Sequence, residues 1–423
     1  MNIGSKRRLI QFAVLLVAFT GTVGDPRELS AQSNAAPASD ARPTRQEMLA
    51  KITVNRPDAF YDPPADVPSR PGALLRSEPL KDVTLPAGMR GWHILYTTSV
   101  NDSTPATAVA TVFAPTEPPA GPRPVITWEH GTTGLLQKCM PSLVSEPTVG
   151  IPALDQIVKA GWVIVATDYS FAEKGGPHPY LIGDGEARAG LDSVRAARQM
   201  PKLTLDERTV VWGHSQGGHS ALWTGIVGLR YAPDVKIVGL AAIAPAANMA
   251  NILAMNIAVD KRLGPYIARS YSRFYPEVTL KQALRPEALA AAREIANLCG
   301  FFPPEDPQRI AALAASFDGP ALATDINPAL AARLAQNIAA HPVTPPVVIA
   351  HGLVDVVVPP PATDAYVDER CAAGQQIEYW KFAGLDYGGI VQPGTSLDEP
   401  IVAWTTARSA NEPQASGCAR KSF

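Results

Sequence analysis

The sequence predicts an α/β fold in which helices flank a mostly parallel central sheet, with a helical cap or lid inserted into it. Short, continuously apolar runs such as 162–166, 235–242 and 346–352 alternate with amphipathic helical segments. Strands that are apolar on both faces are typical of parallel sheets that helices cover on both sides. A length of 423 residues with 46% apolar content is sufficient for one large domain of this class with an insertion.

We expect the sheet to open with an antiparallel hairpin and to continue through strands separated by helices. The expected strands are 92–100 and 107–113 in the hairpin, then 124–128, 162–166, 209–212, 235–242, 346–352 and 377–381. The expected helices are 152–160, 186–200 and one that begins after Ser215.

An alanine-rich segment, 247–340, separates two of the predicted strands. Its pattern predicts helices above the carboxyl ends of the strands, which would form a cap. The alternative is a structural helical subdomain with no role in substrate choice. The core of the fold is then assigned to 76–246 and 341–423.

The chain begins with the pattern of an export signal, which we assign to residues 1–31. A basic stretch at 6–8 precedes an apolar run at 9–20 that is too short to span a bilayer comfortably. Cleavage after Gly24 or Ala31 fits the pattern, and an uncleaved membrane anchor is the alternative. Residues 32–75 are rich in Ala, Pro, Ser and Asp and are expected to form a linker or arm. We therefore expect a secreted or periplasmic protein.

Net charge and cysteine content indicate which partners and which kinds of site the protein should have. A net charge of −2 provides no basic field for nucleic acid. An even number of cysteines in an oxidising compartment permits two disulfides, and three pairings are open. Their spacing matches no metal site, and we expect neither metal nor cofactor. The cysteines are Cys139, Cys299, Cys371 and Cys418.

The candidate nucleophile is Ser215, in the segment Gly213-His214-Ser215-Gln216-Gly217. A Gly-x-Ser-x-Gly turn between an apolar strand and a helix is the nucleophile elbow of the α/β-hydrolase fold. Such a turn projects the serine Oγ above the sheet, and the two glycines leave room for the backbone. A five-residue pattern can match by chance, but here the strand and the helix are both predicted.

A serine nucleophile also needs an acid that orients its base. The apolar strand 346–352 is followed by Asp355, and this fold carries its carboxylate after such a strand, in the chain order Ser, Asp, His. We therefore expect Asp355 to be the acid. The alternative is a carboxylate that caps a loop or a helix.

The oxyanion hole requires two backbone N–H groups near the serine. The N–H of Gln216, at the start of the elbow helix, is the expected first donor. The second should come from the loop after strand 124–128, and we assign it to Thr132. Gly131 or Gly134 would serve in a different register of that loop.

The base is missing from its expected place. No histidine follows His351 in the sequence, and the segment after the last predicted strand reads Gly384-Leu385-Asp386-Tyr387-Gly388-Gly389. Tyr387 itself would be a poor base at neutral pH, because a phenol has a pKa near 10. His130, His351 and His178 are the candidate replacements. Two further alternatives are a weakened or inactive enzyme and a mutated or misread version of an active sequence.

Over residues 75–418, the ordered set of motifs resembles the secretory lipase family of α/β-hydrolases, which includes yeast lipase A-type enzymes. The matching pieces are the loop Trp128–Gly134, Ala166–Tyr169 with His178–Tyr180, the elbow Gly213–Gly218, and His351-Gly352 with Asp355. In that family the final motif resembles Gly-x-Asp-His-Gly-Gly, so Tyr387 stands where the family has its catalytic histidine. The resemblance implies disulfides Cys139–Cys299 and Cys371–Cys418. It also implies hydrolysis of lipid or short acyl esters under a helical cap without a cofactor.

We therefore expect an exported serine hydrolase that cleaves carboxylic esters through an acyl-enzyme on Ser215. The expected substrate is a small-molecule or lipid ester, the cap is the candidate contact with a lipid interface, and the protein is expected to be a monomer. The rival from another class is a non-catalytic protein that binds hydrophobic acyl ligands in the same pocket. An acyltransferase or amidase on the same scaffold is the rival among enzymes.

Overall fold

The computed structural model describes residues 49, 51–102, 104–117, 120–170, 176–300 and 305–423. The predicted export signal lies outside the described residues, as do residues 32–48 and 50 of the predicted arm. Within the described part, no helix has both the length and the apolar character needed to cross a membrane.

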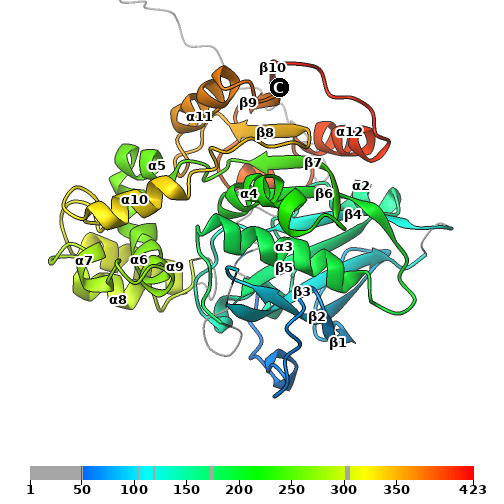
Figure 1. Cartoon of the computed structure of the whole chain (residues 1–423), viewed down its shortest axis with the longest axis horizontal. Helices are drawn as coiled ribbons and strands as arrows, with labels where there is room; N and C mark the ends of the chain where they lie inside the picture. Colours follow the sequence, from blue (N-terminus) through cyan, green and yellow to red (C-terminus); the bar gives the residue numbers. More distant parts are fainter. Residues whose placement is uncertain (1–48, 50, 103, 118–119, 171–175, 301–304) are drawn as a thin grey trace, which may run out of the picture. The chain divides into compact units, whose positions relative to one another are not determined.

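In the described part of the chain, ten strands form one sheet in the order β1-β2-β3-β5-β4-β6-β7-β8-β9-β10 (Figure 1). The pairs among β1, β2, β3 and β5 are antiparallel, and every pair from β5 and β4 onward to β10 is parallel. The strands are β1 (Leu74–Pro79), β2 (Met89–Ser99), β3 (Pro105–Pro115), β4 (Arg123–Glu129), β5 (Val163–Ser170), β6 (Leu205–His214), β7 (Lys236–Ile243), β8 (Val347–Gly352), β9 (Ile377–Phe382) and β10 (Cys418–Ser422). The prediction of a mostly parallel sheet with an opening hairpin is confirmed.

The two edge strands differ from the sequence prediction. β1 begins at Leu74, inside the segment expected to be a linker, and the short turn of helix η1 (Ala59–Tyr61) precedes it. Phe60 and Tyr61 are buried in that turn, so part of the arm packs on the domain. β10 was not predicted because its sequence, Cys-Ala-Arg-Lys-Ser, is polar and its residues are largely exposed.

Helices cover both faces of the sheet. One apolar cluster joins the sheet to α3, α4 and α11, and a second cluster joins the opposite face to α2 and α12. The helices are α2 (Leu154–Lys159), α3 (Gly183–Ala197), α4 (Gln216–Tyr231), α5 (Met249–Met255), α6 (Ile257–Phe274), α7 (Leu280–Ala283), α8 (Leu289–Ile295), α9 (Glu305–Ala315), α10 (Pro328–Gln336), α11 (Pro360–Ala372) and α12 (Asp398–Ser409), and the remaining short turns are η2 (Gln137–Cys139), η3 (Pro141–Leu143) and η4 (Gly389–Val391).

The segment between β7 and β8 contains α5 to α10 and has an apolar cluster of its own. That cluster also includes Tyr180, Leu181 and Val358, which belong to loops of the core. We refer to α5–α10 as the cap. Its apolar contacts with these loops place it over the carboxyl ends of the parallel strands.

Two disulfides tie distant segments together. Cys139, in η2, is bonded to Cys299, which follows α8 in the cap. Cys371, in α11, is bonded to Cys418, the first residue of β10. The pairing is the one that the family resemblance implies, and the second bond fastens the polar edge strand to the helix layer.

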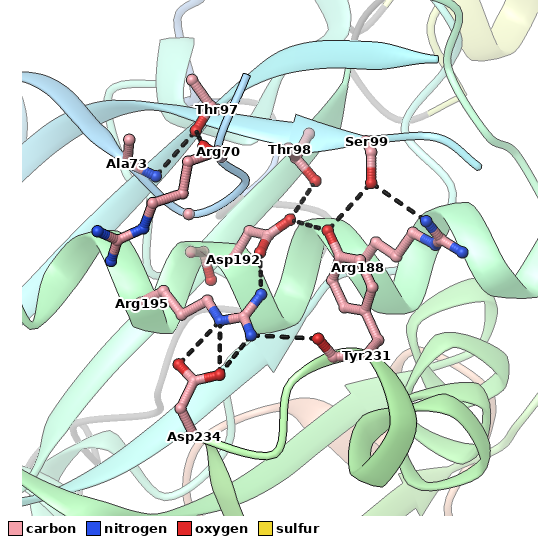
Figure 2. Close-up of polar contacts among 12 residues, drawn as sticks. Arg70, Ala73, Thr97, Thr98, Ser99, Arg188, Asp192, Arg195, Tyr231 and Asp234 are labelled. Carbon is pink, nitrogen blue, oxygen red and sulfur yellow. Dashed lines mark hydrogen bonds and ion pairs between the residues drawn. The ribbon is translucent and has the colours of Figure 1, made fainter. Parts of the chain in front are cut away.

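A buried carboxylate fastens α3 to the antiparallel part of the sheet. Asp192 is fully buried and accepts hydrogen bonds from Thr98 Oγ1 at 2.8 Å, Tyr231 OH at 2.7 Å and Arg195 Nη1 at 3.0 Å (Figure 2). Arg195 is in turn paired with Asp234. Burial raises the pKa of Asp192 to about 6, although the three donors favour the charged form. β2, α3 and the end of α4 therefore meet at one ionisable group.

Replacing Thr98 with valine tests this junction. Thr98→Val keeps the side-chain shape but removes one donor to the buried carboxylate, so we expect a loss of about 1–3 kcal/mol in the free energy of unfolding. Urea denaturation at pH 7 measures it. The matched control is Thr116→Val, at an exposed position where the hydroxyl donates a long hydrogen bond to the Gly88 carbonyl at 3.3 Å. The control should change stability by less than about 0.5 kcal/mol, and equal losses in both variants would contradict the assignment.

Candidate active site

Ser215 lies in a strained turn between β6 and α4. Its φ of 58° and ψ of −113° lie in a region that side chains other than glycine rarely occupy. The turn is held in place because Ser215 N donates to Ile243 O at 2.9 Å and Ser215 O accepts from His219 N and Ala246 N, each at 3.0 Å. The backbone therefore has the conformation that the elbow motif predicts.

The glycines of the motif are required by close backbone contacts. A Cβ on Gly217 would lie 1.7 Å from the carbonyl oxygen of Glu129 in β4, and one on Gly213 would lie 2.0 Å from the carbonyl oxygen of Gly217. No side chain fits at these distances. Because of this contact, the first turn of α4 packs directly against the end of β4.

The two predicted oxyanion donors lie on either side of this contact. Gln216 is the first residue of α4, where helix N–H groups have no partner within the helix. The loop after β4 lies against the elbow, since a Cβ on Gly131 would be 3.5 Å from Ser215 Cβ. Thr132, the next residue, is buried, and its Oγ1 is 2.9 Å from Tyr180 OH. Gly134, in contrast, packs against the Cys139 sulfur.

Asp355 lies in the loop that follows β8 and its side chain is fully buried. Its Oδ1 accepts hydrogen bonds from Val357 N at 2.7 Å and Val358 N at 2.9 Å. Its Oδ2 lies 3.2 Å from His351 Nε2 but accepts no hydrogen bond from the residues that the structure describes. One oxygen of the carboxylate is thus fixed and the other remains available to a donor.

Tyr387 is adjacent to both the elbow and the Asp355 loop. His214 Nε2 donates to the Tyr387 carbonyl at 2.9 Å, and the two rings are 4.6 Å apart. Val354 N donates to Leu385 O at 3.1 Å, which joins the Asp355 loop to the loop that carries Tyr387. The structure therefore brings Ser215, Asp355, Thr132 and Tyr387 into one region at the carboxyl ends of the strands.

The candidate replacement histidines have other partners. His178 Nδ1 is 2.7 Å from Ser170 O, His130 Nδ1 is 2.6 Å from Gly131 O, and His351 Nε2 is 3.0 Å from Val358 O. Within the described ranges, no imidazole forms a hydrogen bond with Ser215 Oγ. The expectation that one of these three groups stands in for the base gains no support from their contacts.

His219 belongs to a polar cluster that sequence reasoning did not find. Its Nδ1 is 2.8 Å from Glu186 Oε2 and its Nε2 is 2.7 Å from Asn337 O, at the end of the cap. Glu186 Oε1 also accepts from Gln216 Nε2 at 2.9 Å. The periodicity placed Glu186 at the start of a helix, but nothing in the sequence indicated that it would be fully buried.

A cavity of about 510 Å³ lies between the cap and the core at this site. Thr132 and Tyr387 line its core side, while Val259, Leu263 and Tyr266 of α6 line its cap side. Most of the lining side chains are apolar, as in pockets that bind small organic ligands. Within the described residues, no cluster of His, Cys, Asp and Glu could hold a metal ion.

Residues 148–285 match the model of a family described as secretory lipase. A protein of Mycobacterium tuberculosis named a probable inactive lipase is 24% identical over 402 residues, which cover 88% of this chain and 86% of that protein. Lipase A of Moesziomyces aphidis is 24% identical over 196 residues, 43% of this chain and 42% of that protein. This chain likewise spans about half the length of several other fungal lipases that it matches.

Solved structures confirm the α/β-hydrolase fold. The closed state of Candida antarctica lipase A matches with a TM-score of 0.66 at 19% identity, over 85% of this chain and 87% of that one. The rice cell wall degrading esterase LipA of Xanthomonas oryzae matches with a TM-score of 0.59 at 20% identity, over 80% of this chain and 98% of that one. At such identities the likeness is one of fold.

His130, in the loop of the predicted oxyanion donor, should make the free energy of unfolding decrease at acidic pH. Burial lowers its pKa to about 4, below the value near 6.5 of an unfolded histidine. Its contribution to stability is therefore complete above pH 6.5 and is lost as the pH falls through 4. Between pH 7 and pH 4.5, the wild type should lose about 2–3 kcal/mol more than His130→Asn. Urea unfolding at the two pH values measures this, and parallel curves for the two proteins would contradict it.

Proposed function

We propose that this chain belongs to the secretory lipase family of α/β-hydrolases, and that it is an exported serine hydrolase of carboxylic esters that forms an acyl-enzyme on Ser215. The observation that carries the proposal is the strained turn at Ser215, beside a helix N-terminus and the Gly131–Thr132 loop. Strain of this kind is found where a nucleophile must be presented to a substrate. Secreted relatives, such as a triacylglycerol lipase of Malassezia globosa, favour export.

In the proposed reaction, Ser215 Oγ attacks the ester carbonyl and its proton passes to a base. The backbone N–H groups of Gln216 and Thr132 stabilise the charge on the tetrahedral oxyanion. Loss of the alcohol leaves an acyl-enzyme, which water then hydrolyses. Asp355 is the acid of this arrangement, with Oδ1 fixed by two backbone donors and Oδ2 available to orient a base.

The transfer of the Ser215 Oγ proton to a base should be the slow step of hydrolysis by this protein. Tyr387 stands where the family resemblance expects a histidine, and a phenol with a pKa near 10 accepts protons poorly at neutral pH. An oxyanion hole without an intact triad still accelerates hydrolysis by about 10³- to 10⁴-fold over water. We therefore propose slow hydrolysis rather than none.

An exposed apolar surface favours lipid esters over soluble ones. Five large apolar side chains, all more than 40% exposed, lie in two segments beside the cavity, and Asn256 Nδ2 joins the segments by a hydrogen bond to Val356 O at 2.8 Å. Asn256 and Val356 both line the cavity. We call this surface the apolar rim. It comprises Met255, Ile257, Leu353, Val354 and Val356.

The second candidate function is a non-catalytic protein that binds acyl ligands in the same cavity. Two observations favour it: the described residues offer Ser215 no imidazole partner, and the relative from Mycobacterium tuberculosis is named a probable inactive lipase. Labelling of the wild-type serine by a fluorophosphonate separates the two functions, because the reagent requires an activated nucleophile.

Restoring an imidazole at position 387 should increase catalysis. Tyr387→His places a base that titrates near pH 6.5 beside Asp355, so kcat/KM for p-nitrophenyl esters at pH 7 should rise by about 10²- to 10⁴-fold. Adding Ser215→Ala to this variant should remove the gain. A wild type that is already fast at pH 7, and that Tyr387→His slows, would show that another group is the base.

The apolar rim should bind lipid surfaces. Val356→Ser removes an apolar side chain that is 77% exposed, and we expect about fivefold weaker partitioning onto phosphatidylcholine vesicles in a cosedimentation assay. Leu229→Ser is the matched control, because Leu229 is also 77% exposed but lies near the far end of α4. Equal partitioning of both variants would remove the rim from the proposal.

A further inference from the structure

The cavity between cap and core contains one feature that ester hydrolysis does not use. Among its described lining residues, Arg262 carries the formal charge, and the others are neutral. Its position follows from helix geometry, since Val259, Arg262, Leu263 and Tyr266 are spaced i, i+3, i+4 and i+7 on α6 and all line the cavity. An arginine thus interrupts the apolar stripe by which α6 faces the cavity.

The guanidinium of Arg262 does not hold the described parts of the fold together. In the described part of the chain, it makes no hydrogen bond or ion pair, whereas Arg285, Arg309 and Arg333 of the cap are paired with Asp325, Glu294 and Glu277. The side chain is exposed, so an anion from solution can reach it.

Guanidinium groups bind carboxylates and phosphates through two parallel N–H donors. We propose that Arg262 binds an anionic group of the substrate, a carboxylate or a phosphate, and so selects amphiphilic esters with a negative charge over neutral esters of equal length. The inference deepens the proposed function, since it names the substrate class of the same cavity. The reacting ester would lie near Thr132 and Tyr387, with the apolar chain between them and Arg262.

Binding measurements test this without any need for turnover. Isothermal titration calorimetry at low salt would compare decanoate, decyl phosphate and decanol on the wild-type protein. We expect either anion to bind roughly threefold to tenfold more tightly than the alcohol, a range set by the exposure of the arginine. The two anions separate carboxylate from phosphate recognition. The preference should shrink at 0.5 M NaCl, because salt screens exposed charges.

Variants of Arg262 then test whether this residue causes the preference for anions over decanol. Arg262→Gln should abolish it, and Arg262→Lys should keep part of it. Arg273→Gln is the matched control, because Arg273 is exposed on the same helix but does not line the cavity. Equal affinity for anions and alcohol in the wild type, or a preference that survives Arg262→Gln, would overturn the inference. Neither result depends on whether Ser215 hydrolyses esters, so the two proposals fail separately.

Discussion

The contact between α4 and β4 is the constraint on which the site depends. The backbone of Gly217 approaches the carbonyl oxygen of Glu129 so closely that a Cβ would lie 1.7 Å from it. This contact fixes where α4 begins, and the start of α4 fixes both the strained conformation of Ser215 and the N–H group of Gln216. The same contact brings the loop after β4 against the elbow. Backbone packing therefore positions the candidate nucleophile and the candidate oxyanion donors.

A buried cluster of polar side chains connects the start of α4 to the cap. Glu186 binds His219 and Gln216 in the first turn of α4, and His219 also binds the carbonyl of Asn337. Asn337 in turn accepts from Gly183 N at 3.0 Å, at the start of α3. Because buried polar groups are costly when unpaired, this cluster fixes the end of the cap relative to the nucleophile. The histidine that follows the elbow is thus structural.

Backbone contacts hold the two loops that carry Asp355 and Tyr387. Asp355 is held by the backbone N–H groups of Val357 and Val358, and neither bond requires a histidine partner. The loop that carries Tyr387 is held by its own backbone, through His214 and Val354. These two contacts therefore use backbone carbonyls of the loop and not the ring of Tyr387.

The sequence by itself determined the elements whose pattern is local. Continuous apolar strands predicted the fold class, and the glycines around Ser215 predicted the strained turn that the structure shows. The absence of a histidine after His351 indicated that the base is missing from its expected place. It did not reveal β10, because a polar edge strand lacks an apolar pattern. Nor did it reveal the burial of Glu186 or the cavity-facing position of Arg262. Those depend on contacts between segments far apart in the chain, such as the His219–Asn337 bond across 118 residues, and only the tertiary structure brings such segments together.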